Sequence, residues 1–115
     1  MANDNKKLVV VWSSGDREIA LKMVFMYTLN SKLNKWWDDI TLIIWGPSSN
    51  LLGQDYELQE YISRIKRAGI VIEACKACTD MYGVSDKLKQ LGVDVKYIGE
   101  TFTAYIMEGR KIITF

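Results

Sequence analysis

The two cysteines of the chain, Cys75 and Cys78, lie three residues apart and follow an apolar, β-branched run that begins at Ile70. Such a run is typical of a parallel strand buried on both faces. Cys75 would then lie at the carboxyl end of that strand, where open α/β sheets hold their sites. A thiolate is a nucleophile, and the pKa of a free cysteine, about 8.5, falls beside a helix N-terminus or a cation. We therefore predict that Cys75 is a reactive thiol and Cys78 its neighbour.

The residues around the cysteines would act on this thiol in opposite directions. Thr79 and Asp80 are typical cap residues for a helical turn, whose N–H groups would stabilise a thiolate or a persulfide. Lys76 would add positive charge, whereas the Asp80 carboxylate would raise the pKa of the thiol. Free cysteine also serves as a small buried hydrophobe. Because the CxxC spacing is typical of thiol chemistry, both interpretations stay open.

The chain contains no histidine, which excludes several kinds of site. Cys-His and Ser-His-Asp activation need an imidazole. Two cysteines fall short of the four ligands that structural zinc takes, so we expect no metal. No glycine-rich nucleotide motif occurs, and we expect no cofactor. A thioredoxin fold is disfavoured, because the only proline precedes the CxxC pair.

A second candidate site follows the first predicted strand. Ser13, Ser14 and Gly15 come directly before a helical pattern, so they could bind an anion in a pocket at the helix start, although ordinary capping explains them equally well.

Apolar runs and helical patterns alternate along the chain, which is typical of a parallel α/β sheet with helices on both faces. The predicted strands are residues 7–12, 40–45, 70–74, 93–98 and 111–115, and the predicted helices are residues 17–34, 54–68, 85–91 and 101–108. We expect a flavodoxin-like, three-layer α/β/α sandwich with strand order 2-1-3-4-5. That order would bring the Ser13–Gly15 loop and the cysteines to one crevice. The helix at 17–34 is apolar on more than one side, which suggests a second cover such as a subunit interface.

Length and composition indicate one domain over residues 1–115. A formal net charge of +1 argues against nucleic-acid binding, and the apolar runs are too short to span a membrane. No secretory signal is evident, so we expect a reducing, cytoplasmic location in which a structural disulfide is disfavoured.

Several segments spread over nearly the whole chain resemble the DsrE family of small sulfur-relay proteins. They are Ser13-Ser14-Gly15-Asp16, Gly46-Pro47-Ser48 with Leu51-Leu52, residues 55–60, Ala74-Cys75, residues 92–95 and residues 109–115. Cys75 and Gly83 keep the eight-residue spacing that the family has between its sulfur-carrying cysteine and a small or turn residue. Met81 and Tyr82 depart from the pattern, since related members carry basic residues there.

The resemblance implies a flavodoxin-like fold, a homotrimer or homohexamer, and a persulfide that Cys75 passes between donor and acceptor proteins. Cys78 would have a resolving or supporting role. The alternatives are a dithiol redox-sensing or small-ligand-binding module, and an oligomeric scaffold whose cysteines are inert.

Overall fold

The computed structural model describes residues 6–115 and contains one five-stranded parallel sheet. The strands are β1 (Lys7–Trp12), β2 (Asp39–Ile44), β3 (Val71–Cys75), β4 (Asp94–Lys96) and β5 (Lys111–Thr114). The helices are α1 (Arg17–Ile19), the π-helical η1 (Ala20–Phe25), α2 (Met26–Leu33), α3 (Pro47–Gln54), α4 (Tyr56–Arg67), α5 (Lys76–Tyr82), α6 (Ser85–Gln90) and α7 (Ile98–Met107). In this part of the chain, no helix has the length and apolarity needed to cross a bilayer.

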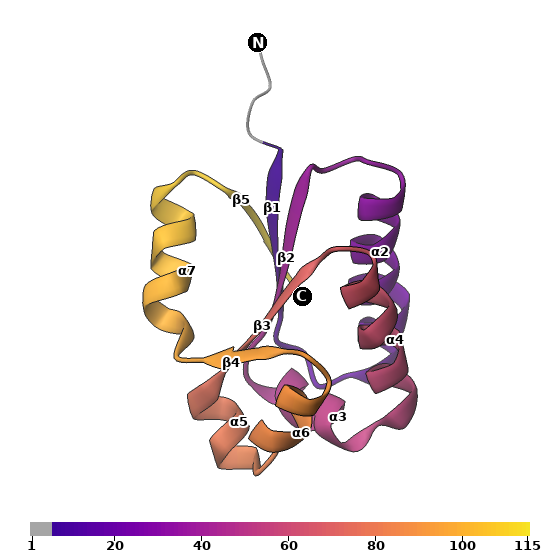
Figure 1. The fold of residues 1–115 in the computed structure, drawn as a ribbon, viewed down its shortest axis with the longest axis vertical. Coiled ribbons are helices and arrows are strands. Elements are labelled where there is room, and N and C mark those ends of the chain that lie inside the picture. Colours follow the sequence, from indigo (N-terminus) through magenta and orange to yellow (C-terminus); the bar gives the residue numbers. More distant parts are fainter. Residues whose placement is uncertain (1–5) are drawn as a thin grey trace.

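The helices form layers on both faces of the sheet, as the sequence predicted (Figure 1). α2 and α4 lie on one face and α7 on the other, while α3, α5 and α6 gather at the carboxyl end of the strands. The predicted fold class, a three-layer α/β sandwich with a five-stranded parallel sheet, is confirmed.

The strand order within this sheet is β4-β3-β2-β1-β5, which corrects the expected order 2-1-3-4-5. β2 lies between β1 and β3 and is buried from Ile40 to Ile44. β4 is an edge strand of three residues that carries Asp94 and Lys96. Strands that are apolar on both faces take the central places of a parallel sheet, and charged strands tolerate its edges. β2 therefore separates the loop after β1 from the loop after β3.

Helix boundaries differ from the prediction mainly at the carboxyl end of the sheet. The stretch after β2, for which no helix is predicted, forms the helix α3. Pro47 stands at its first position, where its fixed φ suits a helix and no N–H is needed. The stretch after Cys75 is the helix α5. The predicted fourth strand is shorter than expected, since Ile98 already begins α7. The helix predicted at 17–34 is continuous, with a π-helical middle section.

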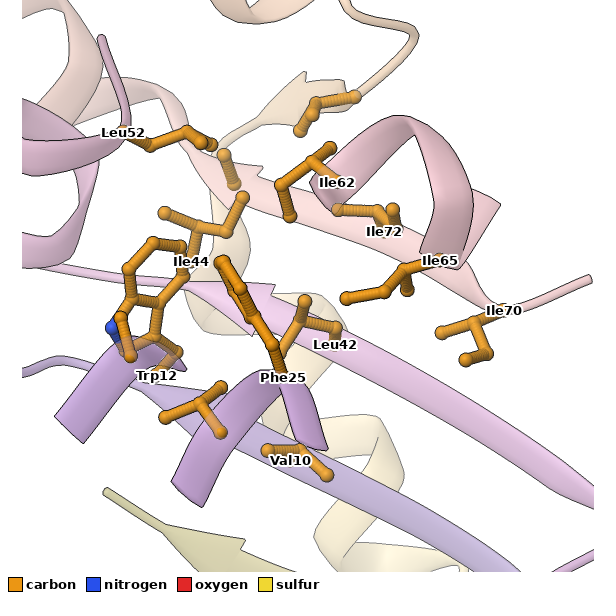
Figure 2. Packing of buried hydrophobic residues seen from close by; sticks show 14 of the residues in the cluster. Val10, Trp12, Phe25, Leu42, Ile44, Leu52, Ile62, Ile65, Ile70 and Ile72 are labelled. Atoms are coloured by element: carbon orange, nitrogen blue, oxygen red, sulfur yellow. The ribbon is translucent and has the colours of Figure 1, made fainter. Parts of the chain in front are cut away.

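The larger part of the core lies between the sheet and the α2–α4 side (Figure 2). Phe25 from η1 packs against Trp12 of β1 and Tyr61 of α4, with ring centroids 4.9 and 5.0 Å apart. A smaller apolar cluster lies under α7 on the other face; its buried members are Val9, Val11, Ile43, Cys75 and Ile98. Cys75, the first predicted site residue, therefore lies in the smaller of the two core clusters.

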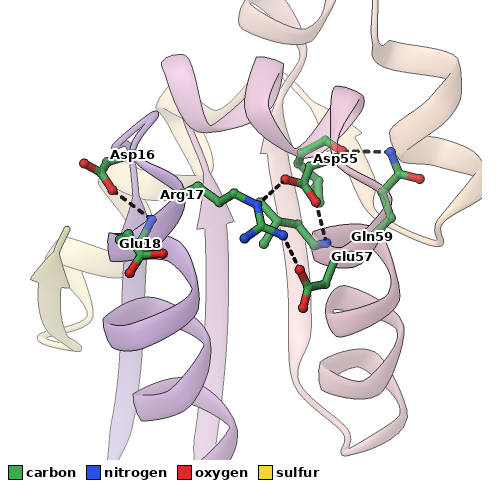
Figure 3. A network of polar contacts seen from close by, with 8 residues as sticks. Asp16, Arg17, Glu18, Asp55, Glu57 and Gln59 are labelled. Carbon is green, nitrogen blue, oxygen red and sulfur yellow. Dashed lines mark hydrogen bonds and ion pairs between the residues drawn. The ribbon is translucent and has the colours of Figure 1, made fainter.

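A polar clamp fastens α1 to the start of α4 (Figure 3). The Arg17 guanidinium donates to Asp55, with its Nε 2.7 Å from the carboxylate, and it also forms an ion pair with Glu57. The hydrogen bond from Arg17 lowers the pKa of the Asp55 carboxyl group. Asp55 is also the N-cap of α4, where it accepts from the N–H of Leu58. The clamp therefore ties the start of α1, which follows the loop after β1, to the start of α4.

Candidate functional site

The site is built around the junction of β3 and α5, where the chain turns from strand to helix at one residue. Cys75 ends β3 and is also the N-cap of α5, with an extended backbone (φ −73°, ψ 114°). Cys78 lies one helical turn further on and packs against the apolar cluster that contains Cys75. Gly83 ends α5 in the left-handed conformation (φ 70°), which glycine adopts without strain. The predicted pair is therefore brought together.

Cys75 is less accessible than the sequence analysis expected. It is 7% exposed and belongs to the apolar cluster under α7, whereas Cys78 is partly exposed. The reason is α7, which begins at Ile98 and packs onto the end of β3. No N–H of α5 donates to the Cys75 side chain, so the predicted stabilisation by the helix start is not formed in this state.

Cys78 has an environment that keeps it protonated. Burial raises the pKa of the Cys78 thiol, and the hydrogen bond with Cys75 raises it further. The Gly46 N–H opposes both effects, because it donates to the sulfur and so favours the thiolate. The balance is a raised pKa, which makes Cys78 a poor nucleophile at neutral pH.

Gly46 is a site residue that the sequence analysis did not identify. It follows β2, has φ +79°, and is the residue before Pro47 at the start of α3. Its contact with Cys78 depends on β2 lying beside β3. The Gly-Pro pair after a buried strand marked a turn, but only the correct strand order could have placed that turn next to the cysteines.

The charged group of Lys76 contacts Asp80 of the same helix and Tyr97. Its ammonium lies 2.7 Å from the Asp80 carboxylate and over the ring of Tyr97, 5.4 Å from the ring centroid. Asp80 raises the pKa of Lys76, and Lys76 lowers the pKa of Asp80. The two opposite charges therefore pair with each other one turn apart in α5.

The loop after β1 makes structural contacts with the end of the chain. The Ser13 hydroxyl donates to the Phe115 carbonyl at 3.0 Å, and the Ser13 and Ser14 N–H groups donate to the same oxygen. The Ser14 hydroxyl accepts from the N–H of Asp16 at 3.0 Å. Gly15 packs against Pro47 and lines a groove that Tyr82 of α5 also borders. Gly15 of this loop therefore shares a groove with the helix that carries the cysteines.

Over residues 6–115, no three side chains of the types histidine, cysteine, aspartate and glutamate come together as a metal-ligand group.

The fold is shared with three solved structures. BT1422 from Bacteroides thetaiotaomicron, a conserved protein of unknown function, is 37% identical; the alignment covers 96% of each chain with a TM-score of 0.93. MTH1491 from Methanobacterium thermoautotrophicum, also of unknown function, and the ychN protein from E. coli are each 21% identical, with 95% of this chain and 98% of theirs covered and TM-scores of 0.80 and 0.74. No protein-family model and no curated protein matches the sequence.

Proposed function

Because the chain belongs to the same family as BT1422 of Bacteroides thetaiotaomicron and carries two contacting thiols at the end of β3, we propose that it is a DsrE-type sulfur-relay protein. Cys75 carries the sulfur as a persulfide, and Cys78 supports or resolves it. The observation behind this proposal is the contact between the two thiols at the junction of β3 and α5. The fold that the chain shares with the ychN protein is consistent with it.

The proposed chemistry is an exchange that needs no cofactor. The Cys75 thiol releases its proton to solvent, and the thiolate attacks the terminal sulfur of a donor persulfide, R–S–SH. As the new S–S bond forms, the donor's S–S bond breaks and the donor leaves as R–S⁻. Cys75 then holds S–SH, and the same exchange passes this sulfur to an acceptor thiolate. A reducing, cytoplasmic setting would keep both thiols available.

The burial of Cys75 suits a carrier that serves protein partners. Exchange rates depend on access to the attacking sulfur. Because Cys75 is 7% exposed, a donor that fits closely at this end of the sheet should transfer its sulfur faster than one that does not. Cys78 is partly exposed and in contact with Cys75, so it lies on the open side of the pair.

We expect Cys75→Ser to abolish sulfur loading. The purified protein is incubated with a low-molecular-weight persulfide donor and then examined by intact-mass analysis. Wild type should gain one sulfur, and Cys78→Ser, the matched control, should gain it as well. Loss of loading in Cys78→Ser with retention in Cys75→Ser would reverse the assignment, and failure of the wild type to load would refute the proposed function.

A second candidate function is a dithiol redox module. The same thiol contact favours it, because oxidation could join Cys75 and Cys78 as a disulfide. In that case, the oxidised protein should lose two hydrogens by mass while the donor adds no sulfur.

We also propose that the protein is a homotrimer or homohexamer. Met23 in η1 and Met26 in α2 are about half exposed, at 49% and 47%, and Ile106 and Met107 of α7 are also exposed. Exposed apolar patches are typical of interfaces, and the two helices would each offer one on opposite faces of the sheet (Figure 1). Multi-angle light scattering of the purified chain should give three or six times the mass of one chain, and a strict monomer would contradict this expectation.

A further inference from the structure

An ionic cluster around one buried carboxylate lies beside Cys75 on the face of the sheet that α7 covers. Glu73 is 3% exposed and precedes Cys75 by two residues in β3, so both side chains point to this face. The Tyr105 hydroxyl of α7 lies 2.9 and 3.0 Å from the two Glu73 carboxylate oxygens and donates to them. The Lys96 ammonium lies 2.8 Å from the same carboxylate. Burying a carboxylate costs free energy unless it is paired, and here Tyr105 and Lys96 are the partners of Glu73.

Lys96 is also the residue that faces Cys75 across the strand pair. The register of β3 and β4 pairs Cys75 with Lys96, which places the two side chains next to each other on one face. An ammonium group has three N–H donors. Glu73 takes one at 2.8 Å, and Asp94, which is more exposed, takes a second at 3.2 Å. No contact to a third acceptor is found among the described residues.

We propose that the Lys96 ammonium binds the anionic persulfide on Cys75, with Glu73 holding the ammonium in place. This inference rests on the proposed function and names the group that would stabilise the loaded state. After transfer, the Cys75 persulfide loses its proton to solvent and becomes S–S⁻. The terminal sulfur lies about 2 Å beyond the sulfur of the thiol, and adjacent strands are about 4.8 Å apart. The loaded cysteine therefore extends its charge into the reach of a side chain on β4.

The Lys96 ammonium and the buried Glu73 carboxylate should shift the pKa of the persulfide in opposite directions. A cation near the persulfide lowers its pKa, and an anion raises it. Lys96 and Glu73 lie on the same face as Cys75 and carry opposite charges. Removing the charge of Lys96 should therefore shift the ionisation of the persulfide upward, whereas removing the charge of Glu73 should shift it downward. If Lys96 and Glu73 only stabilised the fold, the two substitutions would not shift the pKa of the persulfide in opposite directions.

The experiment measures the pH dependence of persulfide alkylation in protein loaded with a low-molecular-weight persulfide donor. All variants carry Cys78→Ser, so that one sulfur is followed by mass. We expect Lys96→Met to raise the midpoint of the profile by about one pH unit, a tenfold change in the ionisation constant. Lys96→Arg keeps the cation and should restore the midpoint. Glu73→Gln should move the midpoint below that of the parent protein.

Two further variants control for charge and for folding. Lys111→Met removes an exposed lysine of β5 and should leave the midpoint unchanged. Glu73→Gln with Lys96→Met replaces the buried pair with neutral groups, so it tests the proposal if Lys96→Met alone does not fold; its midpoint should exceed that of Glu73→Gln.

Loaded protein whose midpoint is the same with and without Lys96 would overturn the inference and leave the proposed function intact. Shifts of the same sign in Lys96→Met and Glu73→Gln would also overturn it. A parent protein that takes up no sulfur would refute the proposed function itself, and the inference with it.

Discussion

Replacing Phe25 with alanine is expected to lower the free energy of unfolding by about 3–5 kcal/mol. Phe25 is fully buried, and it joins three elements, because its ring contacts Trp12 of β1 edge-on and Tyr61 of α4. Alanine would leave a cavity between the helices and the sheet and remove both aromatic contacts, which contribute beyond their buried area. For a domain of this size, the loss is a large part of the total stability.

Urea unfolding followed by circular dichroism measures this effect. The midpoint should fall with little change in slope, which reports lost stability without a change in the surface exposed on unfolding. Tyr56→Ala is the matched control, since this aromatic residue at the start of α4 is 75% exposed; its cost should stay within about 0.5 kcal/mol. A Phe25→Ala protein as stable as the control would show that η1 does not anchor the larger core.

Gly53→Ala is expected to destabilise the protein by about 1–3 kcal/mol, although alanine is ordinarily the better helix former. Gly53 lies in α3, and a Cβ there would stand 2.4 and 2.8 Å from Cγ1 and Cβ of Val84. Val84 is buried, at the start of α6. The close approach holds the α5–α6 segment against α3, whose N-cap residue is Gly46.

A double-mutant cycle tests this packing. Val84→Ala removes the closest atom, Cγ1, and leaves Cβ, so it should relieve part of the clash. The two substitutions together should cost less than the sum of their separate costs by about 0.5–3 kcal/mol. Strict additivity in urea unfolding would contradict a direct contact between the two residues.

The fold class follows from the sequence because its signals are local. The runs that became β1 and β2 are mostly apolar after a charged first residue, and the amphipathic pattern at Leu58, Ile62 and Ile65 defines α4 through contacts one turn apart. The order of the strands in the sheet could be predicted only by comparing segments with one another. The apolar second strand and the charged fourth strand already favoured a central β2 and an edge β4, but periodicity within a segment does not express that preference.

Some features of the site likewise depend on neighbouring residues, and others depend on the tertiary structure. The sequence by itself determined that Cys75 ends a strand, since that depends on neighbouring residues, but it placed Cys78 in a loop before a helical turn, whereas α5 already begins at Lys76. Only the tertiary structure decided that α7 covers Cys75, that Gly46 contacts Cys78, and that Lys96 faces Cys75 across the strand pair. These contacts join residues distant in sequence. They depend on how the strands are ordered and on where each helix packs, which the free energy of the whole core determines.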